Sequence, residues 1–263
     1  MAQLAATTLE HPTKKPSAVS AEVRGAVTGV ATAGRSVTIS ARRLLSLLWL
    51  AAATIVLLSL LQDILIFLVP EAGFSDRIYR LDLDAEASLP TWFSCALMML
   101  CSLMLFLVAA QAAQDRLWPA LPWFLLAAIF LLLSLDEIAM VHEWISAALA
   151  ARIENSGLFY FAWTLPALII CLPGLVCFLP FILRFRGLDR VLLIGSAIVF
   201  LSGAVGMEML AGAEAEVAGI DSLRYRLLAT VEESLEYAGL LIFLTFILRQ
   251  LRASYGRTEI RFL

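Results

Sequence analysis

The stretch LLLSLDEIAMVHEWI, residues 131–145, joins a long apolar run to a group of ionisable side chains. The preceding residues, 121–130, are apolar and include a single proline. A membrane span needs about 20 mostly apolar residues, so this part of the chain is long enough to be one. Its ionisable residues are Asp136, Glu137, His142 and Glu143. The stretch therefore predicts a membrane helix with ionisable groups near one end.

The composition extends this prediction to the whole chain. Of the 263 residues, 61% are hydrophobic and 16% are charged, whereas a soluble domain is about half apolar and a quarter charged. Six segments qualify as spans: 44–69, 91–113, 118–146, 159–183, 190–212 and 226–249. They lack the alternation of a barrel strand, and lipid offers the backbone no hydrogen-bond partners. The sequence predicts an all-α polytopic membrane protein, with a bundle of six transmembrane helices in residues 44–249.

The basic residues predict the orientation of this bundle. If residues 1–43 lie in the cytoplasm and the spans alternate, most of the 19 Lys and Arg residues fall on the cytoplasmic side. This asymmetry is typical of inner-membrane proteins and predicts that both termini are cytoplasmic. We therefore expect a bacterial inner-membrane protein. We also expect the N-terminal tail, residues 1–43, to be flexible, because few aromatic residues occur there. Residues 250–263 form the predicted C-terminal cytoplasmic tail.

Small residues at helical spacing accompany the acids of the fifth and sixth segments. Such residues let two membrane helices approach closely. The spaced sets are Ser202 with Gly206, then Ala204, Glu208 and Gly212, and finally Glu232, Glu236 and Gly239. We therefore predict that these two spans touch near Glu208 and Glu236.

The predicted topology places acids of four spans at one level, in the outer half of the bundle. An ionised side chain at mid-bilayer costs about 2.5–3.5 kcal/mol on insertion scales, and neighbouring acids also repel one another. A bound metal ion, bound protons or external water must offset that cost. The acids are Asp63 in the first span, Asp136, Glu137 and Glu143 in the third, Glu208 in the fifth, and Glu232, Glu233 and Glu236 in the sixth.

Carboxylates with one imidazole suit a divalent ion such as iron, manganese, zinc or calcium. The sixth-span acids rank first as ligands, because Glu236 can chelate together with Glu232 or Glu233 from one helix face. The candidate ligands are Glu232, Glu233, Glu236, Glu208, Asp136, Glu137, Glu143 and His142, with Asp63 as a further acid of the layer. On a straight helix His142 points away from Asp136 and Glu143, so it joins them only if the helix is irregular.

Three functions fit this pattern. The first is metal-dependent redox or hydrolytic chemistry on a lipid-soluble substrate. The second is proton or cation translocation through the carboxylates. The third is a non-catalytic subunit or assembly factor of a membrane complex. We expect contact with the lipid bilayer, a homo-oligomer or a larger membrane complex as partner, and no nucleic acid.

The external loop before the second span carries further acids, including Asp82, Asp84 and Glu86. Since the loop lies outside the spans, we expect these three side chains to be hydrated. Their replacement is then expected to change stability little.

Overall fold

The computed structural model describes residues 40–69, 71, 73 and 77–255, and within them every regular element is helical. The predicted all-α class is thus confirmed for this part of the chain. Most of the two predicted tails, 1–43 and 250–263, lies outside the described residues. Where the tails are described, the terminal helices extend into them, since the first helix begins at Ala41 and the last ends at Tyr255.

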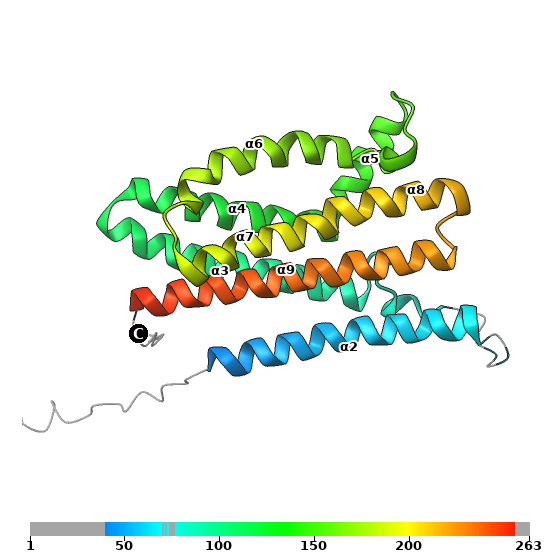
Figure 1. The fold of residues 1–263 in the computed structure, drawn as a ribbon, viewed down its shortest axis with the longest axis horizontal. Helices are drawn as coiled ribbons and strands as arrows, with labels where there is room; N and C mark the ends of the chain where they lie inside the picture. Colours follow the sequence, from blue (N-terminus) through cyan, green and yellow to red (C-terminus); the bar gives the residue numbers. More distant parts are fainter. Residues whose placement is uncertain (1–39, 70, 72, 74–76, 256–263) are drawn as a thin grey trace, which may run out of the picture. The chain divides into compact units, whose positions relative to one another are not determined.

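The helices follow one another through short connections (Figure 1). Two 3-10 turns and one π-helical turn, η4, supplement the α-helices. The order is α2 (Ala41–Leu68), η2 (Tyr79–Leu81), α3 (Leu89–Asp115), α4 (Leu117–Ala139), α5 (Val141–Ala150), η3 (Gly157–Phe159), α6 (Thr164–Ile182), α7 (Gly187–Leu201), η4 (Ser202–Met207), α8 (Glu208–Ala218) and α9 (Leu223–Tyr255).

Five helical stretches within the described residues are long and apolar enough to cross a membrane. They are Ala41–Leu68, Leu89–Gln114, Leu117–Ala139, Thr164–Ile182 and Gly187–Ala218. The predicted sixth span, 226–249, lies within α9, which is not among these five. The structure therefore supports five apolar helices that are compatible with membrane spans.

Helix α9 is the centre of the packing, and Figure 1 shows it between α2 on one side and α7 and α8 on the other. It contacts α2, α3, α7 and α8. Its fully buried side chains include Tyr237, Leu240, Leu241, Leu244, Phe246 and Ile247. Helices α2 and α6 are peripheral, because only 11% of the most apolar 18-residue stretch of each helix is buried. Since neighbouring helices cover α9, its carboxylates face the inside of the bundle.

Glycines bring α9 against the α7–η4 segment, as the small-residue spacing predicted. A Cβ atom added to Gly239 would lie 2.6 Å from the Cβ of Phe200, and one added to Gly203 would lie 2.8 Å from the carbonyl oxygen of Glu232. The predicted pairing of Ser202 with Gly206 at this contact is wrong, because both residues are exposed. Gly203 follows Phe200 by three residues, so both lie on the helix face toward α9, and the π-helical turn changes the facing of the residues that follow it.

The predicted third span, 118–146, is not one helix. It divides into α4 and α5 at Met140, whose φ of 51° is left-handed. The Met140 N–H donates to the Asp136 carbonyl at 2.7 Å and ends α4, which is a common way to terminate a helix. Because of this break, the direction of every side chain after Met140 differs from the straight-helix expectation.

Candidate metal centre

The break at Met140 brings His142 to Asp136. The Asp136 Oδ1 atom accepts the backbone N–H of His142 at 2.9 Å, and Oδ2 lies 3.0 Å from the His142 Nδ1 atom. Asp136 thus holds both the first turn of α5 and the imidazole ring. With Nδ1 occupied by a carboxylate, Nε2 is the ring nitrogen that remains open to a ligand.

Two further carboxylates lie beside this imidazole. Glu86, His142 and Glu143 each offer a ligand atom, and these atoms all lie within 4.8 Å of one another. In the described part of the chain, no other set of three or more His, Cys, Asp or Glu side chains meets this criterion. Glu86 and His142 are half-buried and Glu143 is exposed, so the group opens onto the surface.

Left-handed backbone conformations occur on both sides of the group. Of the described non-glycine residues, only Ala87 and Met140 have positive φ, each at 51°. Ala87 follows Glu86 directly, and Met140 precedes His142 and Glu143 closely. A left-handed non-glycine residue costs about 1–2 kcal/mol, and such strain is concentrated at functional sites. The chain therefore accepts strain at the two positions that direct these ligands toward one another.

The electrostatics of the group favour bound cations or protons. Burial disfavours the protonated form of His142, but the hydrogen bond and the charge of Asp136, together with Glu86 and Glu137, raise its pKa above the usual value. Burial also raises the pKa of Glu86, and the charges of Glu143 and Asp136 raise it further, against the opposing effect of His142. Both groups hold protons more tightly than isolated side chains do, as expected where negative charge accumulates.

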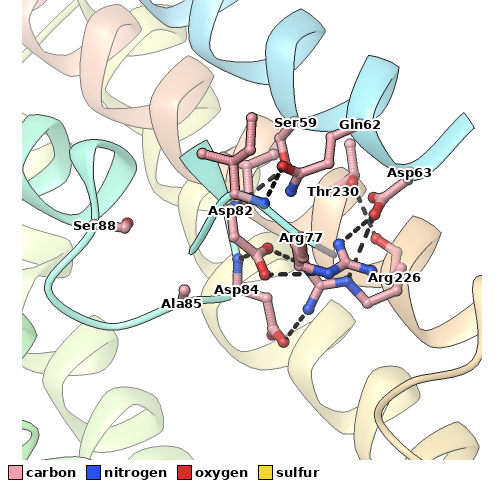
Figure 2. A network of polar contacts seen from close by, with 12 residues as sticks. Ser59, Gln62, Asp63, Arg77, Asp82, Asp84, Ala85, Ser88, Arg226 and Thr230 are labelled. Atoms are coloured by element: carbon pink, nitrogen blue, oxygen red, sulfur yellow. Dashed lines mark hydrogen bonds and ion pairs between the residues drawn. The ribbon is translucent and has the colours of Figure 1, made fainter. Parts of the chain in front are cut away.

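Glu86 belongs to the segment between η2 and α3, which buried ion pairs attach to the bundle (Figure 2). Arg226 of α9 donates through Nη2 to Asp82 and through Nη1 to Asp84 at 2.6 Å. Arg77 pairs with Asp63 of α2, and its Nε lies 3.6 Å from Asp82. The segment is therefore bound to α9 and α2 at once.

This network corrects the expectation that Asp82 is hydrated, whereas Asp84 is exposed but paired with Arg226. Asp82 is only 4% exposed, and Asp84 also accepts a hydrogen bond from the Tyr225 hydroxyl at 2.9 Å. Asp63, predicted to be an acid of the layer, is 1% exposed and belongs to the network of arginines. Removal of either loop aspartate takes one partner from the buried Arg226. We therefore expect replacement of Asp82 or Asp84 to destabilise the protein.

The remaining predicted ligands lie on the inner side of the group. Glu208 accepts a hydrogen bond from the Trp163 indole N–H at 2.9 Å, and the Trp163 ring lies 5.3 Å from the His142 ring. Glu232 is close enough to Glu208 for the two carboxylates to interact electrostatically. Glu137 is close enough to act electrostatically on Glu86, and also on two other carboxylates of α9, Glu233 and Glu236.

Sequence reasoning placed His142, Glu143 and Asp136 among the candidates but missed Glu86. The missing ligand comes from a loop, where the helical periodicity used to rank the other acids carries no information. Arg77 was also missed as a counter-ion. One signal was present in the sequence. Asp82, Asp84 and Glu86 occupy alternate positions just before Pro90, where the second predicted span begins. Acids so close to a span can indicate that they have specific partners.

The three groups fit a transition metal ion. One imidazole and two carboxylates suit zinc, iron or manganese, whereas an imidazole is not a usual ligand of calcium or magnesium. A carboxylate on the second ring nitrogen is the usual outer partner of a metal-binding histidine, and Asp136 has that role here. Three protein ligands leave a coordination position for water or substrate.

Comparison with known proteins identifies the family of this chain but does not indicate an activity. Neither the curated proteins nor the solved structures contain a match to this chain. A family model described as "Domain of unknown function (DUF8692)" matches residues 47–251, which include every helix that lines the metal-centre candidate and the arginine network. The chain therefore belongs to the DUF8692 family.

Proposed function

We propose that this protein is an integral membrane protein that binds a divalent transition metal ion through Glu86, His142 and Glu143. The observation that carries the proposal is the hydrogen bond between Asp136 and the Nδ1 atom of His142. It fixes the orientation of the imidazole, and a nitrogen of this ring lies within 4.8 Å of carboxylate oxygens of Glu86 and Glu143. Nothing in the packing of a helix end requires that combination.

The expected chemistry follows from the free coordination position of the metal ion and from the place of its ligands beside the apolar helices. A metal ion held by three protein groups activates bound water or polarises a substrate carbonyl or phosphoryl group. The ligands come from α5 and from the segment before α3, next to two helices that are compatible with membrane spans. A lipid-soluble substrate whose polar group reaches the end of these helices is therefore the expected reactant, in hydrolytic or redox chemistry.

The proposal includes the predicted topology. Helix α9 forms the sixth span, both termini are cytoplasmic, and the metal centre lies on the extracytoplasmic side of a bacterial inner membrane. Two observations support this arrangement. The basic residues collect on the other side, and α9 has the length and the buried apolar half that a central span needs.

A second candidate function is proton movement toward the metal centre. Glu208 interacts electrostatically with Glu232, and Glu137 does so with Glu233 and Glu236, so acidic side chains extend from the proposed metal centre into the bundle. Clustered intramembrane carboxylates are the expected groups of a proton relay. These residues also stay candidates for a second ion, with Glu236 ranked first.

Metal analysis of the purified protein tests the proposal. We expect a stoichiometric transition metal in the wild type, and its loss in Glu86→Gln and His142→Gln. Glu154→Gln, which changes an exposed glutamate in the loop after α5, is the matched control and should keep the metal. A wild type without metal, or a Glu86→Gln protein that keeps it, contradicts the proposal. Loss in Glu236→Gln alone places the ion in the α9 cluster instead.

A further inference from the structure

Arg226 lies at the junction between α9, α2 and the segment that carries Glu86. Its side chain is 7% exposed and reaches two aspartates of that segment, Asp82 and Asp84. Figure 2 shows both carboxylates directed at the guanidinium group, with the chain continuing through Ala85 toward Ser88. Glu86 lies between these two residues in the sequence, so the backbone that presents Glu86 starts from an anchor on Arg226.

The anchor has support from α2. The Nε atom of Arg226 is 3.9 Å from Asp63 Oδ1, and Asp63 also pairs with Arg77. The backbone N–H of Leu83 donates to the Ser59 hydroxyl at 3.2 Å, which ties the same segment to α2 a second time. Buried and mutually paired charges have few alternative positions, so this part of the segment is held rigidly.

The other end of the segment has its own attachment. The Thr91 hydroxyl donates to the Ala85 carbonyl at 2.9 Å, and the Tyr79 hydroxyl donates to the Glu86 carbonyl at 2.5 Å. The backbone of Glu86 is thus fixed from both directions. Loss of the upstream anchor should loosen Glu86 without releasing it completely.

We infer that Arg226 is a positioning residue for the metal centre, which holds Glu86 where His142 and Glu143 can share an ion with it. The inference rests on the proposed function, because the position of Glu86 matters in this way only if Glu86 binds the ion. Metal ligands must be held within about 0.5 Å of their productive positions, and side chains further out supply that precision. Arg226 supplies it here from α9, on the far side of the segment from the proposed ion.

The test compares two neighbouring arginines of α9. Arg226→Gln removes the anchor, whereas Arg224→Gln removes an arginine that is 82% exposed and lies 3.5 Å from Glu214. The measurement is titration of metal-stripped protein with Co²⁺ or Zn²⁺. We expect Arg226→Gln to weaken the affinity about 10-fold or more, as the loss of an outer-shell partner does. Arg224→Gln should leave the affinity unchanged.

A double variant separates positioning from general loss of stability. Glu86→Gln is expected to lose the metal on purification, so its residual binding through His142 and Glu143 is measured by titration at high Co²⁺ concentration. If Arg226 acts through Glu86, then Arg226→Gln should not weaken this residual binding further. A general effect on the fold would weaken binding equally in both backgrounds. Additive losses of affinity would therefore overturn the inference.

A milder variant keeps the test decisive if Arg226→Gln does not fold. Asp84→Asn removes the negative charge of one partner of Arg226 but leaves the contact with Asp82. We expect a smaller but measurable loss of affinity, together with faster hydrogen exchange at the amides of Leu83 and Asp84 in metal-free protein. The amides of α9 near Leu244 should keep their protection.

The outcomes for the two proposals are distinguishable. A wild type that binds no metal rejects the proposed function, and the role of Arg226 at that site falls with it. If the wild type binds metal while Asp84→Asn and every folded Arg226 variant bind it equally well, the proposed function survives and the positioning role is overturned.

Discussion

At the scale of the residue, the proposed metal centre depends on one pair, Asp136 and His142. Asp136 accepts from both the backbone and the ring of His142, so it sets the position of the ring and raises its pKa. The same carboxylate makes the imidazole a better metal ligand and a better base for protons. Metal ions and protons therefore compete at Nε2 and at Glu86.

This competition predicts how pH affects metal binding. Because the pKa values of His142 and Glu86 are both raised, their protons come off at a higher pH than usual, and affinity should rise with pH through the neutral range. Asp136→Asn should lower the pKa of His142 and move the midpoint of that rise to lower pH. It should also weaken binding about 10- to 100-fold at high pH, where orientation alone matters. Metal titrations across the pH range measure both effects.

Two results would contradict the prediction for Asp136→Asn. If the midpoint moves to higher pH in Asp136→Asn, or does not move, then Asp136 does not control the protonation of His142. Glu154→Asp serves as the control, since Glu154 is exposed and lies in the loop after α5.

At the scale of the element, two departures from regular helix decide which side chains meet. The left-handed residue at Met140 turns His142 toward Asp136, and the π-helical turn η4 changes the facing of the helix from Glu208 onward. A helix wheel drawn through either position assigns later residues to the wrong face. Close contact of α7 with α9 then depends on glycines, because any side chain there would occupy the partner's backbone.

Glycine substitutions test this contact. Gly239→Ala should destabilise the protein by about 1–3 kcal/mol, because the new Cβ would lie 2.7 Å from the backbone nitrogen of Phe200, which cannot move aside cheaply. Gly195→Ala in α7 is the matched control. It meets nothing within 4 Å and should be neutral or stabilising by about 0.5–1 kcal/mol. Thermal unfolding in detergent compares them, and equal stability of the two variants would contradict the packing.

At the scale of the whole molecule, α9 determines how the bundle is organised. It carries the acids Glu232, Glu233 and Glu236 and also contributes more of the large, fully buried apolar side chains than any other helix. Neighbouring helices shield this mixture from lipid. In the proposed topology, that shielding would allow α9, which is not among the five apolar candidates, to pass through a membrane with its polar groups on the inside.

Cysteine labelling tests this topology in a cysteine-free background. An impermeant maleimide should label Ile220→Cys, before α9, in intact cells. It should label Ala253→Cys, at the end of α9, only after permeabilisation, because α9 crosses the membrane in the proposed topology. Leu188→Cys at the start of α7 should behave like Ala253→Cys. Labelling of Ala253→Cys from outside would show that α9 does not span. All three positions are exposed. The native residues to replace are Cys95, Cys101, Cys171 and Cys177.

The sequence by itself determined the helical class, the positions of the apolar helices and the contact between the segments of Glu208 and Glu236. These follow from length, composition and local spacing, which depend on neighbours in the chain. Only the tertiary structure decided that Asp63, Asp82 and Asp84 pair with arginines and that Glu86 joins His142. A loop residue has no periodicity that reports its partners, and a single left-handed residue changes the direction of all that follow. The ligand set therefore depends on backbone geometry that residue spacing does not encode.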